Sequence, residues 1–145
     1  MADELKVEIT GLEELHRDFQ SLARKIQPKE LQPILKKEAA VFARKLLAVT
    51  PRRKTGNLQK GVKAWSPKIN ARHPEAMARV GVKYQIAPHV HLVEYGTVAR
   101  YTDAGARRGI MPAHPFIMPL ANAQMPGMLR RLMASIRDVI YKEWR

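Results

Sequence analysis

The sequence predicts an α+β fold in which a small antiparallel sheet packs against two N-terminal helices and a long C-terminal helix. Three stretches carry apolar residues at the spacing of one helix face: residues 12–26, residues 30–49 and the stretch after Pro119. Two short stretches between the second and third of these have the composition and turn-rich flanks of strands. A chain of 145 residues is long enough to bury its own core, so residues 1–145 are expected to form one domain.

The N-terminal third is expected to form one strand and two helices. Residues 4–10, ELKVEIT, alternate like a half-buried strand. Residues 12–26 follow as a helix, with Thr10 and Glu13 as a capping box. Its apolar stripe contains Leu12, Leu15, Phe19, Leu22, Ala23 and Ile26. Residues 30–49 form the second helix, with Pro33 in its first turn, where a missing amide proton costs little. The stripe of this helix contains Leu31, Ile34, Leu35, Ala39, Phe42, Leu46 and Val49.

The middle of the chain is expected to turn and then to form the sheet. Residues 50–58, TPRRKTGNL, are basic and rich in turn residues. Residues 61–68 and 76–84 are predicted as two strands joined by residues 69–75. The strand residues expected to face a core are Val62, Ala64, Met77, Val80 and Val82. Residues 89–96, HVHLVEYG, do not alternate cleanly, which predicts a short helical turn that ends at Gly96.

A long flexible loop and the last helix are expected in the C-terminal third. Residues 97–111 lack periodicity, and loops of this length in small domains are usually functional or mobile. Pro119 is expected to open the helix, and the pair Pro126–Gly127 to kink it or divide it into two segments. The apolar stripe of this helix contains Leu129, Leu132, Met133, Ile136, Val139 and Ile140.

The charge of the chain is strongly basic and unevenly distributed. The formal net charge is +13. Residues 1–19 carry six acidic and two basic side chains, a net of −4, whereas residues 36–68 carry ten basic and one acidic, a net of +9. Such a charge favours a partner of opposite sign, either nucleic acid or an acidic protein face. A solvated basic surface is the simpler interpretation, because no nucleic-acid recognition motif accompanies the charge.

Composition also excludes several kinds of site. The chain has no cysteine, which rules out disulfides, thiolate metal sites and cysteine nucleophiles. No apolar run approaches the roughly 20 residues that span a membrane, so no membrane partner is expected. The acidic, alternating start of the chain does not resemble a signal peptide, which favours synthesis and assembly in the cytoplasm.

The histidines of residues 89–96 and nearby His114 raise the possibility of a metal site. His91 and Glu94 would meet on a helix and His114 could join them, a donor set that zinc accepts. The stretch is not an HExxH motif, and histidine and glutamate also hydrogen-bond the backbone around turns. The serines lie outside any GxSxG turn, no glycine-rich phosphate loop occurs, and carboxylates are scarce. The sequence therefore predicts neither an enzyme nor a metal or other cofactor.

Four motifs in order along the chain are similar to those of one family of phage proteins. They are V-x-I-T-G-L-x-x-L with Val7, Ile9, Thr10, Gly11, Leu12 and Leu15; a turn with Pro51, Thr55, Gly56 and Leu58; H-L-V-E-[FY]-G-T with His91, Leu92, Val93, Glu94, Tyr95, Gly96 and Thr97; and P-A-x-P-F with Pro112, Ala113, His114, Pro115 and Phe116, followed by Ile117 and Pro119. On these motifs the chain resembles the neck or tail-completion proteins, also described as minor tail components, of HK-type lambdoid bacteriophages.

The resemblance implies that these motifs are structural. The HLVEYGT segment is expected to form a turn that points Leu92 and Tyr95 inward and ends on a glycine free to take a positive φ. Glu94 is expected to pair with a base or with backbone amides. The PAHPF segment is expected to hold an extended lead-in to the last helix, with Phe116 anchored in the core.

The resemblance also implies a structural virion protein that forms a ring of six or twelve copies around the DNA channel. Its implied partners are a head-closure or connector protein, a tail terminator or tail tube protein, and the packaged DNA in the lumen. Assembly is expected in the host cytoplasm. The acidic N-terminal segment of one copy could meet the basic stretch 36–68 of the next. Candidate contacts to a neighbour or to DNA are Arg52, Arg53, Lys54, Arg100, Arg107 and Arg108. The alternative is a basic DNA-binding domain, whose binding would depend steeply on salt.

Overall fold

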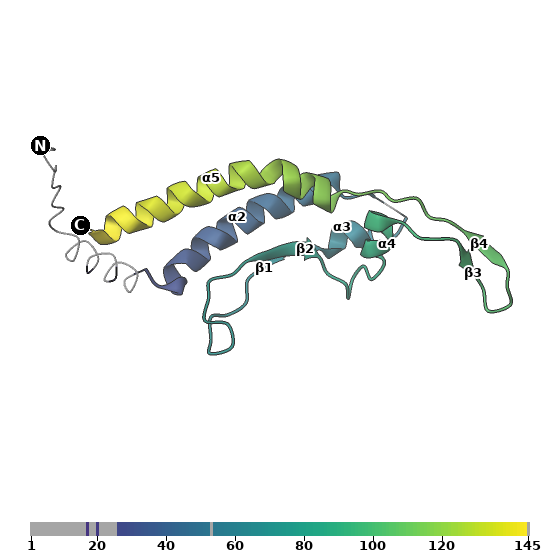
Figure 1. Cartoon of the computed structure of the whole chain (residues 1–145), viewed down its shortest axis with the longest axis horizontal. Helices are drawn as coiled ribbons and strands as arrows, with labels where there is room; N and C mark the ends of the chain where they lie inside the picture. The colour runs from purple at the N-terminus through teal and green to yellow at the C-terminus, as the bar shows by residue number, and fades with distance from the viewer. Residues whose placement is uncertain (1–16, 18–19, 21–25, 53, 145) are drawn as a thin grey trace, which may run out of the picture.

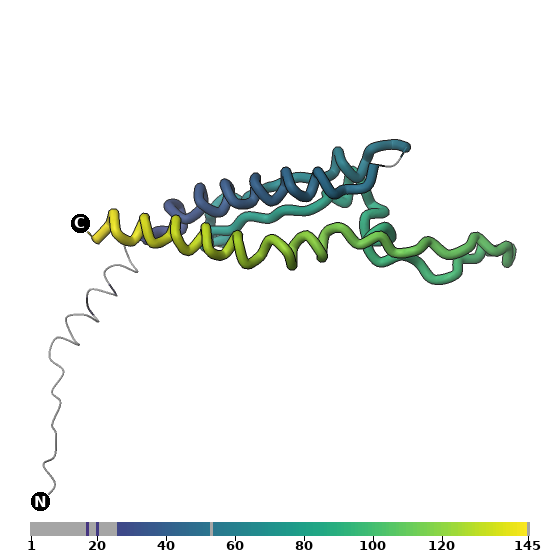
Figure 2. The backbone as a smooth tube through the Cα atoms, turned by 90° about the horizontal axis from the view of Figure 1, so that it is seen from above, coloured from purple at the N-terminus to yellow at the C-terminus, as the bar shows by residue number. Residues whose placement is uncertain are grey.

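The computed structural model describes residues 17, 20, 26–52 and 54–144, and this part of the chain is elongated (Figure 1). Helices α2 (Pro28–Val49) and α5 (Ile117–Trp144) run antiparallel and side by side. A hairpin of β1 (Val62–Trp65) and β2 (Arg79–Val82) packs against α2. A second hairpin extends from the end of the molecule opposite Trp144 (Figures 1 and 2). The α+β class, the small antiparallel sheet and the long C-terminal helix are thus confirmed.

The first two expected elements fall largely outside the described residues. The strand predicted at residues 4–10 cannot be compared with the structure for this reason. Within the helix predicted at residues 12–26, Arg17 and Gln20 are helical.

Helix α2 begins two residues earlier than the sequence predicts. Gln27 precedes it in extended conformation, and Pro28 occupies the first turn, where its fixed φ suits a helix start. Pro33 therefore lies inside the helix, where it removes one helical hydrogen bond, and not in the first turn as expected. The helix ends at Val49, and the amide and hydroxyl of the next residue, Thr50, both donate to the carbonyl of Leu46.

The β1–β2 hairpin pairs Val62 with Val82 and Trp65 with Arg79. A polar network on Gln32 of α2 fixes it to the helix. The Gln32 amide group donates to Ser66 and to the carbonyls of Pro67 and Met77, and its oxygen accepts from the Met77 amide at 3.0 Å. Of the strand residues expected to face a core, Ala64 is exposed.

The core lies where the C-terminal end of α2 meets two short helices and the start of α5. Helices α3 (Asn57–Gly61) and α4 (Val90–Tyr95) supply Leu58 and Val93, which pack with Leu46, Ala87 and Phe116. The sequence predicts α4 correctly, but it predicts a turn and the start of a strand where α3 forms. Gly56, at φ 65°, sets the first turn of α3 and lets Leu58 enter the core.

Three expectations for the C-terminal third differ from the structure. Helix α5 starts at Ile117 and not at Pro119. Of the kink or division expected at Pro126–Gly127, the division is wrong, because α5 continues through this pair as one helix of 28 residues. Residues 97–111 are not an irregular loop throughout, because β3 (Arg100–Tyr101) pairs antiparallel with β4 (Arg107–Gly109). We call residues 97–111 the arm.

None of the helices in the described part of the chain combines the length and apolar character that a membrane crossing requires.

Candidate functional site

The carboxylate of Glu94 caps the start of α5. It accepts hydrogen bonds from the amides of Phe116, Ile117 and Met118 at 2.9, 3.1 and 3.0 Å. The first amides of a helix have no partner within the helix. Pro119 has no amide proton, so the Glu94 side chain accepts from all the amides between Phe116 and Pro119. The negative charge also lies at the positive end of the helix dipole. Glu94 was expected to pair either with a base or with backbone amides, and in the structure it pairs with backbone amides.

The environment of Glu94 favours its charged form. Glu94 is only 4% exposed, and burial by itself would raise the pKa of its carboxyl group. Hydrogen bonds from the Met118, Phe116 and Ile117 amides lower it by more, so the pKa of Glu94 lies below its ordinary value. The carboxylate is therefore a fixed structural anion at neutral pH rather than a group poised to exchange protons.

The segments that follow α4 and precede α5 are joined along their backbones. The His114 amide donates to the Val93 carbonyl at 2.8 Å. The Thr97 amide donates to the Met111 carbonyl at 2.9 Å, and the Met111 amide donates to the Thr97 hydroxyl at 3.0 Å. The structure thus brings the HLVEYGT and PAHPF motifs together into one unit, residues 91–97 with residues 111–118, which we call the α4–α5 junction.

Gly96 is the tightest point of the α4–α5 junction. Its φ of 74° and ψ of −171° belong to a region that residues with a side chain avoid. A Cβ atom there would lie 2.8 Å from both the Ala113 amide nitrogen and the Met111 carbonyl oxygen. Only glycine lets the two segments approach this closely.

Tyr95 of the HLVEYGT motif was expected to point inward, and this is wrong. Tyr95 points outward, with 73% of its surface exposed, and Val93 is the buried residue of this turn. Leu92 is half-buried. The reason is that Glu94 must face the start of α5, which turns its neighbour Tyr95 away from the core.

The histidines do not join Glu94 in a common site. The ring of His91 stacks on Tyr84 with 6.3 Å between ring centroids, while the Glu94 carboxylate is occupied by three amides. His114 is exposed and bonds through its backbone. Within the residues that the structure describes, no group of three His, Cys, Asp or Glu side chains could hold a metal ion.

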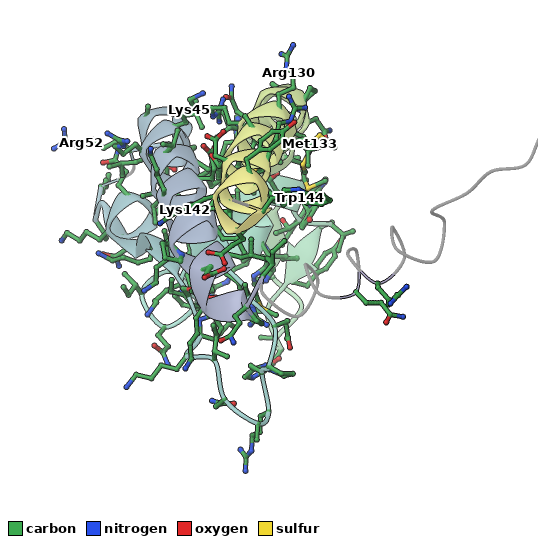
Figure 3. The ribbon with its side chains drawn as sticks, turned by 90° about the vertical axis from the view of Figure 1, so that its left-hand side faces the viewer. Lys45, Arg52, Arg130, Met133, Lys142 and Trp144 are labelled. Atoms are coloured by element: carbon green, nitrogen blue, oxygen red, sulfur yellow. The ribbon has the colours of Figure 1, made fainter. Side chains whose placement is uncertain are left out.

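The basic candidates Arg52 and Lys54 lie exposed in the turn between α2 and α3, while Arg53 lies outside the described residues. Figure 3 shows Arg52 pointing away from both long helices. Thr55 of the same turn accepts from the Asn57 amide at 3.5 Å. The turn thus presents its cations to solvent while Leu58, three residues beyond Thr55, anchors it.

The arm carries the remaining basic candidates, Arg100, Arg107 and Arg108, which are all exposed. Apolar side chains of the arm are also exposed: Val98, Tyr101 and Ile110. At its tip, the Thr102 amide donates to the Ala106 carbonyl and the Gly105 amide to the Thr102 carbonyl, both at 2.8 Å. The structure therefore does not unite the five described candidates into one patch: Arg52 and Lys54 lie in the turn after α2, and the three arginines lie on the arm.

An ion pair between the long helices was not foreseen from the sequence. Arg131 of α5 binds Glu38 of α2 through two nitrogens, with the shortest contact at 2.8 Å. Glu38 is the one acidic residue between positions 36 and 68, and its isolation among basic residues was the available signal. Lys45 of α2 also donates to Gln124 of α5.

A hollow of about 250 Å³ between α2, β2 and α5 is lined mainly by apolar side chains, among them Phe42, Val80 and Leu132. Its one titratable lining residue is Glu38, which Arg131 engages. The hollow thus offers contact surface rather than acid, base or nucleophile.

One family model matches the chain, described as "Bacteriophage HK97-gp10, putative tail-component", over residues 13–96. The match covers more than half of the 145 residues and ends at Gly96, before the arm and α5. No curated protein and no solved structure matches the chain.

Proposed function

This chain belongs to the HK97-gp10-like family of bacteriophage tail components, and we propose that it is a structural protein of the neck, where the virion head joins the tail. The family match is the observation that carries this proposal. A tail component has its place in the virion, and host cytoplasm would be the site of assembly. In the proposed mechanism, subunits form a ring around the DNA channel and bind a connector or head-closure protein on one side. A tail terminator or tail tube protein binds on the other.

The distribution of apolar residues supports assembly. The buried core of the described residues is small and centres on Leu46, Leu58, Ala87, Val93 and Phe116. Large apolar side chains remain exposed on the arm and along α5. Exposed large apolar side chains on two parts of one subunit are suited to contacts with other proteins.

Charge supplies the proposed contact between neighbouring copies. Arg131 neutralises Glu38, so the ten basic side chains of residues 36–68 retain their full charge for an outside partner. Residues 1–19, with a net charge of −4, supply that partner from the next copy. A closed ring needs two different faces of the subunit in contact, and these two segments meet that requirement.

Reversing three charges in the turn after α2 is expected to prevent ring formation. The triple variant Arg52→Glu, Arg53→Glu, Lys54→Glu places like charges opposite the acidic segment, and this should weaken association at least roughly tenfold. Light scattering would measure the mass of the variant beside the unaltered protein. The control reverses the charges of Arg72, Arg79 and Lys83, which are exposed and lie outside residues 36–68. Intact rings from the first variant would refute this contact.

Removing the arm is expected to leave a folded domain that no longer joins heads to tails. The arm is closed at its base by the Thr97–Met111 bonds, so replacing residues 98–110 with a short glycine linker preserves the α4–α5 junction. The thermal unfolding midpoint would report folding, and head–tail joining in an extract lacking the native protein would report function. A variant that joins heads and tails normally would exclude a role for the arm, and one that unfolds would assign the arm to the core.

A second function, DNA binding, is favoured by a basic hollow on the face shared by α2 and the chain after β1. Lys29, Lys36 and Lys68 line this hollow of about 550 Å³ around Gln32. Such a cluster suits phosphate groups. Binding to duplex DNA that weakens steeply with salt would support this function, and binding that is absent at low salt would eliminate it.

A further inference from the structure

The arm projects from the rest of the described chain, at the end of the molecule opposite Trp144 (Figures 1 and 2). All residues from 103 to 108 are exposed. The aliphatic residues Val98 and Ile110 lie at the base of the arm. Its outer part, residues 100–109, contains no aliphatic side chain larger than alanine, and Tyr101 is its one aromatic residue. The outer part therefore offers mainly polar and charged contacts.

The outer part of the arm carries positive charge that the chain itself does not neutralise. Arg100, Arg107 and Arg108 stand against one acidic residue, Asp103, a net charge of +2. Within the described part of the chain, no hydrogen bond or ion pair engages the guanidinium groups of these three arginines, whereas that of Arg131 pairs with Glu38. Three unpaired guanidinium groups on one projection favour an anionic partner.

The register of the hairpin distributes these cations over both of its faces. Tyr101 lies opposite Arg107, so the side chains of this pair share a face. Arg100 precedes Tyr101 in β3 and therefore lies on the other face. A register shift leaves Arg108 without a residue opposite it. A flat protein surface would engage one face of the arm, whereas cations on both faces suit a groove between two anionic walls.

The dimensions of the hairpin fit the major groove of duplex DNA. Paired strands lie about 4.8 Å apart, and the groove is about 12 Å wide, which admits a two-stranded ribbon with its side chains. Five extended residues from the base to the tip span about 17 Å, more than the groove depth of about 8.5 Å. The shift at Arg108 also increases the twist of the ribbon, as a helical groove requires. Phosphate groups line both walls of the groove, within reach of both faces of the ribbon.

The arm is ordered before any partner binds. At the tip, the Thr102 hydroxyl accepts from the Ala106 amide at 3.0 Å, in addition to the backbone bonds there, and Gly105 turns the chain with a φ of 79°. The bonds between Thr97 and Met111 close the base. A hairpin that is already ordered loses little conformational freedom on binding.

We propose that the arm binds duplex DNA in the major groove, with Arg100, Arg107 and Arg108 on phosphate groups. The inference deepens the proposed function and rests on it, since DNA passes through the proposed ring. Phosphate contacts carry no sequence information, so they suit DNA of any sequence, including DNA that moves past the protein. The arm is a different site from the lysine-lined hollow, which lies beside the start of α2 (Figure 1).

Removing the three charges tests the contact. The full-length triple variant Arg100→Gln, Arg107→Gln, Arg108→Gln and the unaltered protein would be titrated onto a fluorescent duplex of mixed sequence and about two helical turns. Fluorescence anisotropy would be recorded at several salt concentrations. The variant should bind at least roughly tenfold more weakly at low salt. Its plot of log affinity against log salt should be shallower by about 2.7, or about 0.9 for each lost phosphate contact.

Two further variants control for net charge and for folding. The triple variant Lys29→Gln, Lys36→Gln, Lys68→Gln removes the same charge from exposed lysines of the hollow and should bind DNA more tightly than the arm variant. Changing the three arm arginines to lysine keeps the charge, and this variant should bind within about threefold of the unaltered protein. All variants should keep the mass and the thermal unfolding midpoint of the unaltered protein, because the changed side chains are exposed.

Four results would overturn the inference. The first is an unaltered protein that does not bind the duplex at low salt. The second is an arm variant with unchanged affinity for DNA; if it also fails to join heads to tails, the arginines contact an acidic protein surface instead. The third is an equal loss in the arm and hollow variants, since this would report net charge alone. The fourth is a lysine variant as weak as the glutamine variant.

These readouts separate the inference from the proposed function. A ring-sized mass together with unchanged DNA affinity in the arm variant would overturn the DNA contact and leave the structural role intact. A monomer that does not join heads to tails would count against the structural role, whatever the arm binds.

Discussion

Replacing Glu94 by alanine is expected to lower the free energy of unfolding by about 3–5 kcal/mol. The substitution removes three hydrogen bonds to a charged acceptor and leaves the amides of Phe116, Ile117 and Met118 without a partner. The Phe116 amide is buried and the other two are partly buried. An unpaired buried amide costs on the order of 1–3 kcal/mol, and the start of α5 also loses a favourable charge at its dipole. The free energy would be measured by urea unfolding. The control Glu94→Gln keeps one acceptor oxygen and should lose less.

The contribution of Glu94 should also depend on pH. Because its folded-state pKa lies below the unfolded value of 4.5, the stabilisation is complete above the unfolded pKa. It is lost as the pH falls through the lower, folded-state pKa. The difference in stability between the natural protein and Glu94→Gln should therefore shrink in acid. A difference that stays constant from pH 7 to pH 3 would show that the ionised carboxylate is not the stabilising form.

Gly96→Ala is the second change with a large expected effect, a loss of about 3 kcal/mol or more in the free energy of unfolding. The new residue would have to adopt a φ of 74°, and its Cβ atom would approach two backbone atoms to 2.8 Å. Backbone atoms cannot move aside as a side chain can, so the α4–α5 junction must open.

Gly105→Ala is the matched control for that change. Gly105 also has a positive φ, of 79°, but nothing lies within 4 Å of its would-be Cβ atom. Its substitution should cost about 1 kcal/mol, from backbone strain alone. Equal losses in the two variants, compared by urea unfolding, would mean that the close approach at Gly96 contributes nothing.

The sequence correctly predicted the elements whose residues carry a pattern of their own. Helix α2 and the hairpin of β1 and β2 lie where the sequence places them, and α4 ends at Gly96 as expected. These elements carry a local signal, either a repeated apolar spacing or a glycine at a fixed place. The apolar stripe of α2 also includes Leu46, which is fully buried in the core.

The missed features depend on contacts between distant segments. Nothing local reveals that Glu94 will cap a helix that starts 23 residues later, and so the outward position of Tyr95 was not predicted. Pro126 lies near the middle of an otherwise strongly helical stretch, and α5 tolerates it as one continuous helix. The paired strands of the arm are two and three residues long, too short for periodicity to reveal.

The most direct test of the assembly proposal is the mass of the full-length protein in solution. Light scattering would be recorded at low and at moderate salt, with no DNA present. A mass of six or more subunits, reduced to the subunit mass of 16.5 kDa by the charge reversal at residues 52–54, is the predicted result. A protein that stays at 16.5 kDa at every concentration and salt tested, but binds duplex DNA with a steep salt dependence, would contradict self-assembly and favour DNA binding instead.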